Sequence, residues 1–145
     1  MQNSKLTTGN IVILVSGVVI FLASFLAFYK FSLLGSDTTF SAWKGSPVFL
    51  FGVATLPAIL GLIMAVHVAV TAFANVDLPD RVLGLTWDQV HLALGFQCAI
   101  TMIVFLVRDK SVLDFGIGFF LMLIAAVGLL VGAIMRQREG APTGF

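Results

Sequence analysis

The sequence is short of charge and of cysteine. Only 10% of its 145 residues are Asp, Glu, Lys or Arg, whereas soluble domains average about 25%. Apolar residues make up 59%, a composition that excludes a soluble domain or a disordered tail. The single cysteine, Cys98, excludes an intramolecular disulfide and a multi-cysteine metal motif, and a net charge of +1 offers no basic field for nucleic acid. These absences predict a small integral membrane protein whose main surroundings are the lipid bilayer.

Long uncharged runs predict how many times the chain crosses the membrane. A helix needs about 20 mainly apolar residues to cross the hydrocarbon core of a bilayer. Four segments meet this requirement, at 11–29, 48–74, 90–107 and 115–135. We therefore predict an all-α, polytopic membrane protein, a single domain over 1–145, with four transmembrane helices packed as a compact bundle. Four crossings place both termini on the same side.

Local motifs mark the ends of these spans. Ser46 followed by Pro47 is typical of a helix start, and Pro57 inside the second span predicts a kink. Thr86 with Gln89 three residues later is the pattern of a capping box. The third helix is therefore expected to begin close to Thr86.

The charged residues all lie outside the predicted spans. Lys and Arg divide four against four between the two sides, so the positive-inside rule gives no orientation. Arg136 and Arg138 directly flank the last span and favour cytoplasmic termini, in what we expect to be a bacterial plasma membrane. With no Asp, Glu, Lys or Arg in the spans, a proton-coupled carrier that works as a monomer is disfavoured.

Small residues follow one face of the second span and recur in the last. Small side chains let helix backbones approach closely, which drives helix association in lipid. We expect them to pack helices within the chain, in a non-catalytic accessory or assembly subunit of a larger membrane complex, without an active site of its own. The predicted packing residues are Ala54, Ala58, Gly61, Ala65, Ala69, Ala72, Gly128 and Gly132.

The two histidines support a second interpretation, a redox subunit that binds haem b or another metal centre. His67 and His91 lie in neighbouring spans, and imidazole is a common haem ligand. Counted from Asp77 and Asp88, however, their depths are about 15 Å and about 5 Å, so they can share one iron only if tilt or a buried loop closes the gap. The alternative expectation is that His67 bonds a backbone carbonyl or a threonine, while His91 lies at headgroup level near Trp87.

Polar residues of the third span allow a third interpretation. Gln97 and Thr101 share a helix face, where they could bond a neighbouring helix or line a water path. The second possibility corresponds to a homo-oligomeric pore or a carrier of neutral solutes. Cys98 has no acid or base partner in this pattern and is expected to pack as a small apolar residue.

Two further segments carry a resemblance. A short first loop contains Phe40-Ser-Ala-Trp43, and the glycine-rich final span ends in Arg136-Gln-Arg138. In these features and in its hydropathy profile the chain resembles small four-span membrane proteins of unknown function that are frequent in actinobacteria. The resemblance implies a membrane topology and no chemistry.

Overall fold

The structure, a computed structural model, describes residues 6–44, 51–74, 76, 78–108 and 114–140. The predicted helix start at Ser46 and Pro47 lies outside these residues. The described residues contain four helices, whose bounds are α1 Thr8–Ala23, α2 Phe51–Phe73, α3 Trp87–Val107 and α4 Ile117–Glu139.

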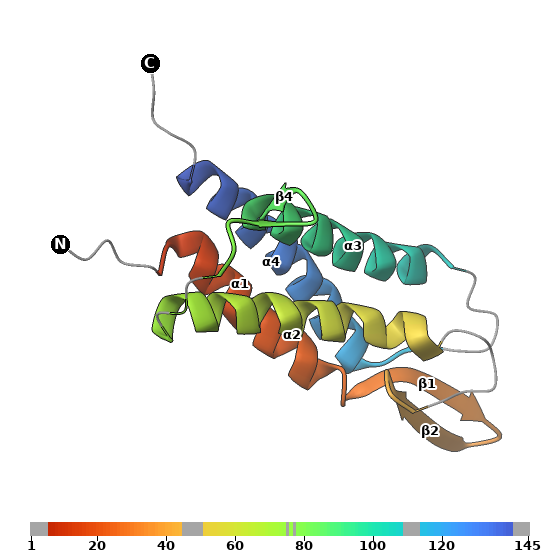
Figure 1. Cartoon of the computed structure of the whole chain (residues 1–145). Coiled ribbons are helices and arrows are strands. Elements are labelled where there is room, and N and C mark those ends of the chain that lie inside the picture. The colour runs from red at the N-terminus through yellow and green to blue at the C-terminus, as the bar shows by residue number, and fades with distance from the viewer. Residues whose placement is uncertain (1–5, 45–50, 75, 77, 109–113, 141–145) are drawn as a thin grey trace.

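The four helices pack as one antiparallel bundle. Each helix contacts the next in sequence, and α1 also packs along α4, which closes the bundle (Figure 1). The beginning of α1 and the end of α4 meet, because the Gly9 backbone N–H donates to the Glu139 carboxylate at 3.1 and 3.2 Å. The predicted helical bundle is therefore confirmed.

The predicted number of spans is wrong. In the part of the chain that the structure describes, three helices are long and apolar enough to cross a membrane, namely α3, α4 and the part of α2 over Val53–Phe73, and they indicate a membrane protein. Helix α1 has only 16 residues. At 1.5 Å per residue it is about 24 Å long, against a hydrocarbon core of about 30 Å. The predicted span over 11–29 is thus helical only as far as Ala23.

Helix α1 ends because the chain turns into a strand. The Ser24 hydroxyl donates to the Phe21 carbonyl oxygen at 2.5 Å, and the Trp43 indole N–H donates to the Ser24 hydroxyl oxygen at 2.7 Å. Strand β1 (Ala27–Leu33) then pairs antiparallel with β2 (Ser36–Ser41). Phe and Tyr favour strands as well as apolar environments, so apolar content alone did not separate this strand from a helix.

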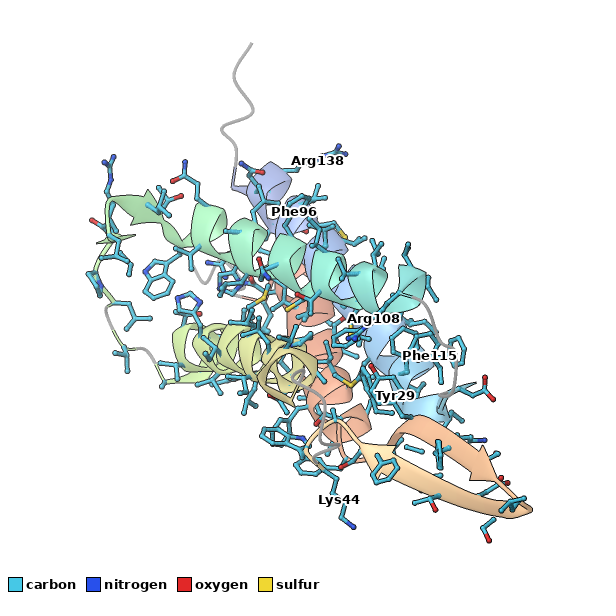
Figure 2. All side chains as sticks on the ribbon, turned by 90° about the vertical axis from the view of Figure 1, so that its right-hand side faces the viewer. Tyr29, Lys44, Phe96, Arg108, Phe115 and Arg138 are labelled. Carbon is cyan, nitrogen blue, oxygen red and sulfur yellow. The ribbon has the colours of Figure 1, made fainter. Side chains whose placement is uncertain are left out.

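The fold is consequently not purely helical. A three-stranded sheet has the order β2-β1-β5, with the short β5 (Asp114–Phe115) against the base of β1. Tyr29 of β1 and Phe115 of β5 stack with their ring centroids 6.0 Å apart, and Figure 2 shows them side by side. The β1–β2 hairpin extends away from the helices (Figure 1). A second hairpin, β3 (Arg81–Val82) with β4 (Leu85–Thr86), precedes α3.

Both hairpins turn on a Leu-Gly pair. Leu34 and Gly35 have φ values of 50° and 84°, and Leu83 and Gly84 have 52° and 83°. Positive φ at both central residues is the mark of a type I′ turn, which favours Asn-Gly. The two leucines are 99% and 98% exposed. Each hairpin therefore holds a leucine in an unfavourable backbone conformation with no packing to compensate.

Several of the predicted packing residues lie at close contacts between helices. A Cβ on Gly17 would meet the Gly61 carbonyl oxygen, so the backbones of α1 and α2 nearly touch. A Cβ on Gly132 would lie 2.8 Å from Ile13 of α1. Of the remaining residues in this set, Ala54, Ala58 and Ala65 are buried, and Ala69, Ala72 and Gly128 are half-buried.

Candidate functional site

The two histidines meet between α2 and α3. His91 Nε2 lies 2.8 Å from His67 Nδ1, a hydrogen-bond distance, and the ring centroids are 4.8 Å apart at an interplanar angle of 56°. His91 is 1% exposed and His67 is 9% exposed. The molecule therefore contains a buried imidazole pair.

The two histidines lie at similar depths, contrary to the estimate from Asp77 and Asp88, because α2 ends before Asp77. His67 lies six residues before the end of α2 at Phe73, and His91 lies four residues after the start of α3 at Trp87. These separations are about 9 Å and about 6 Å, a difference that modest tilt closes. The expected bond from the His67 ring to a backbone carbonyl or a threonine is absent among the described residues, because Nδ1 pairs with His91 and Nε2 has no partner there. The Thr71 hydroxyl donates instead to the His67 main-chain carbonyl at 2.9 Å.

Local structure at the start of α3 positions Trp87 over the pair. The predicted capping box is confirmed: the Gln89 N–H donates to the Thr86 hydroxyl oxygen, and the Gln89 side chain accepts from the Thr86 N–H. Trp87 follows at once, and its ring stacks on His67 at 3.9 Å and 25°. Its indole N–H donates to the Pro79 carbonyl oxygen at 2.7 Å. Trp87 thus joins the α2–α3 connection to His67.

The outer nitrogens of the pair are buried without a hydrogen-bond partner among the described residues. They are His67 Nε2 and His91 Nδ1. Two neutral imidazoles carry two protons; one lies in the shared hydrogen bond and the other must lie on an outer nitrogen. The pair therefore presents one unpaired donor and one unpaired acceptor, each costing about 1–3 kcal/mol when buried. Buried polar groups are rarely left this way in folded proteins.

An ion pair lies beside the two histidines. Arg136 acts electrostatically on both rings, and Asp88 acts on His67. The Arg136 Nε donates to the Asp88 carboxylate at 2.6 Å, and Arg136 also donates to the Asn10 side-chain oxygen at 3.2 Å. These contacts connect α1, α3 and α4 at one end of the bundle.

The paired rings do not fit an axial haem site. With metal–nitrogen bonds of about 2.0–2.1 Å, two ligands on opposite sides of one metal lie about 4 Å apart with the macrocycle between them. His67 and His91 instead bond each other directly at 2.8 Å, which leaves no space for a porphyrin between the rings. Within the described part of the chain, no group of three or more His, Cys, Asp or Glu side chains gathers around a common point.

The other polar residues of α3 divide between the interior and the surface. Cys98 is fully buried, with its sulfur 3.7 Å from the Pro57 carbonyl oxygen. Thr101 is buried and its hydroxyl donates to the Gln97 main-chain carbonyl at 2.7 Å. The Gln97 side chain is exposed and donates to Thr101 Oγ1 at 3.2 Å. Gln97 therefore lies on the outer surface of the bundle and does not line its interior.

Sequence reasoning missed the contact between the histidines and the role of Trp87 above them. One signal was present, because both histidines lie within two turns of the helix ends that flank the same connection. No family model matches this chain, and neither does any curated protein or any solved structure. The resemblance to four-span actinobacterial proteins therefore stays a prediction.

Proposed function

We propose that this chain is a non-catalytic accessory subunit of a larger membrane protein complex, in a bacterial plasma membrane with its termini in the cytoplasm. The observation that carries the proposal is the position of Gln97, a polar side chain exposed on a membrane-spanning helix.

Gln97 lies at the centre of α3, ten residues from either end of the helix. Its amide is therefore about 15 Å from each helix end, at the depth of the bilayer midplane. An amide exposed to hydrocarbon is costly, and its only side-chain hydrogen bond within the described residues is to Thr101 of the same helix. Polar groups of this kind in membranes are commonly satisfied across a helix–helix contact.

The surface around Gln97 is suited to a second helix. The apolar core segment of α3 is 39% buried, less than the corresponding segments of α4 (44%) and α2 (50%). Apart from Leu106, its exposed large apolar residues lie on one continuous face along the helix. They are Phe96, Ile100, Ile103, Val104 and Val107. We infer that a partner helix covers this face and bonds Gln97.

Site-specific crosslinking in native membranes tests the proposal. A photoreactive residue at position 100 on α3 is compared with one at position 124 on α4, where Ile124 is 69% exposed. We expect position 100, but not 124, to give a discrete adduct with another protein, identified by mass spectrometry. An adduct of two copies of this chain would replace the proposal with a homo-oligomer. Equal labelling of lipid from both positions would refute it.

A substitution of Gln97 provides an independent measurement. A hydrogen bond between membrane helices is worth about 0.6 kcal/mol on average and about 1.7 kcal/mol at most. Gln97→Leu should therefore weaken partner binding about 3- to 17-fold, while the isolated chain unfolds at the same or a higher temperature. Ile100→Leu, one turn away, is the matched control and should leave partner recovery unchanged. Undiminished recovery with Gln97→Leu contradicts the assignment of this face.

A further inference from the structure

We propose that His67 and His91 form a binding site for a transition-metal ion, copper(I) in preference to a divalent ion, at the position of their shared proton. The site rests on the geometry of the imidazole pair and does not depend on the accessory role proposed above.

The two inner nitrogens face each other across the position that an ion would take. His67 Nδ1 and His91 Nε2 are 2.8 Å apart and their rings are inclined at 56°. Copper(I) held by two nitrogens alone binds them nearly in line, as the shared proton does, and with bonds of about 2.0 Å this needs a separation of about 4 Å. The rings must therefore move apart by about 1.2 Å. Imidazole is a good ligand for copper and zinc, and a single ion needs none of the space that a porphyrin would.

Metal binding at this pair conserves protons. The neutral pair carries two protons, one in the shared hydrogen bond and one on an outer nitrogen. When both inner nitrogens bind a metal, the shared proton moves to the outer nitrogen that held a lone pair, so none leaves the pair. Two outer nitrogens lack a partner before and after this exchange, namely His67 Nε2 and His91 Nδ1. Metal binding therefore removes only one hydrogen bond, the one between the two rings that the metal replaces.

Charge favours a monovalent ion. Both ligands are neutral, and the carboxylate of Asp88 is already compensated by Arg136 at 2.6 Å. The cost of burying an ion rises with the square of its charge, so a divalent ion costs about four times as much as a monovalent one. Trp87, stacked on His67 at 3.9 Å, adds an aromatic face that attracts a cation. Copper(I) is the imidazole-binding ion that meets these conditions.

Trp87 provides the probe. The chain has two tryptophans, so Trp43→Phe leaves Trp87 as the only indole fluorophore. Copper(I) is titrated into the detergent-solubilised variant without oxygen, against a competing chelator of known affinity. We expect saturable quenching of the Trp87 emission at one ion per chain, and weaker binding of zinc(II) under the same conditions. Absence of stoichiometric quenching overturns the proposal, and tighter binding of zinc(II) overturns the preference for copper(I).

Variants assign the ligands. Loss of one of two chelating nitrogens typically costs about 100-fold or more in affinity, because the second bond forms intramolecularly. The double variant His67→Phe with His91→Phe should therefore lose the copper(I) site. Cys98→Ala removes the only thiol and is the control, which should bind like the unmodified chain. Loss of binding in Cys98→Ala, or its retention in the double variant, refutes the assignment.

X-ray absorption at the copper edge tests the site without any substitution. The unmodified chain, loaded with one equivalent of copper(I), should show two nitrogen neighbours at about 2.0 Å with the outer-shell scattering of imidazole. A first shell containing sulfur would place copper elsewhere and overturn the proposal. This measurement remains decisive if the double histidine variant fails to fold.

Discussion

Replacing the leucine at each hairpin tip by asparagine should stabilise the protein. Leu34 and Leu83 have φ values of 50° and 52°, in the left-handed region that costs an L-residue about 1–2 kcal/mol. Asparagine is enriched in this region, and Asn-Gly is the favoured pair for a type I′ turn. Because the leucines are 99% and 98% exposed, their removal sacrifices no packing.

We expect Leu34→Asn together with Leu83→Asn to raise the free energy of unfolding by about 1–2 kcal/mol. For a chain of this size that corresponds to roughly 3–6 °C in melting temperature. Thermal unfolding followed by circular dichroism in detergent micelles measures the change.

The alanine variants at the same two positions separate backbone conformation from exposed apolar area. Alanine removes most of the apolar side chain but gains no preference for positive φ, so it should leave the melting temperature nearly unchanged. A gain of equal size with alanine would mean that the backbone reasoning is wrong. A loss with asparagine would mean that the leucines make a stabilising contact, contrary to their exposure.

Three further predictions concern packing, capping and pH. Gly61→Ala should lower the free energy of unfolding by about 1–3 kcal/mol, because the added Cβ meets a neighbouring helix. In Gly128→Ala the added Cβ faces only a serine side chain that can rotate, so the same denaturation assay should show a smaller loss. Thr86→Ala removes the N-cap of α3 and should lower the free energy of unfolding by about 1 kcal/mol, as measured by equilibrium unfolding. An unchanged unfolding midpoint would contradict this prediction. Burial raises the pKa of the Tyr29 hydroxyl above 10.0, against an opposing effect of Arg108. The folded state therefore holds this proton more tightly, so stability should be constant below pH 10 and fall above it, and Tyr29→Phe should remove part of that fall.

The sequence was sufficient for features that depend on neighbouring residues along the chain. The capping box at Thr86 and Gln89 needs only a spacing of three, and the helices over most of the uncharged runs need only length and apolar content. The same criteria misassigned the start of strand β1 to a helix, because Ala27, Phe28 and Tyr29 continue the uncharged run of α1 up to Lys30. Its conformation depends on pairing with β2 and on the contact between Trp43 and Ser24, neither of which apolar content encodes.

At the candidate site, the sequence predicted which residues matter but not how far apart they lie. The identities of His67 and His91 as the main candidates came from the sequence, but their separation did not. Charged residues were used as markers of depth, whereas α2 ends at Phe73 and α3 begins at Trp87. An error of a few residues at each helix end shifts the inferred depth by several ångströms, which is as large as the distance that decides whether two rings touch.

The shortness of α1 has a consequence for the surrounding lipid. The β1–β2 sheet that follows it has an open edge at β2, and an open sheet edge is excluded from hydrocarbon because its backbone groups would lack partners. The apolar layer beside α1 must therefore be no thicker than about 24 Å, whereas α2, α3 and α4 are about 32–35 Å long and can cross a layer of ordinary thickness, or a thinner one by tilting. Lipids next to α1 are expected to be compressed by several ångströms. The energy of that compression favours thin bilayer regions, and it favours neighbouring proteins whose hydrophobic belts are equally short.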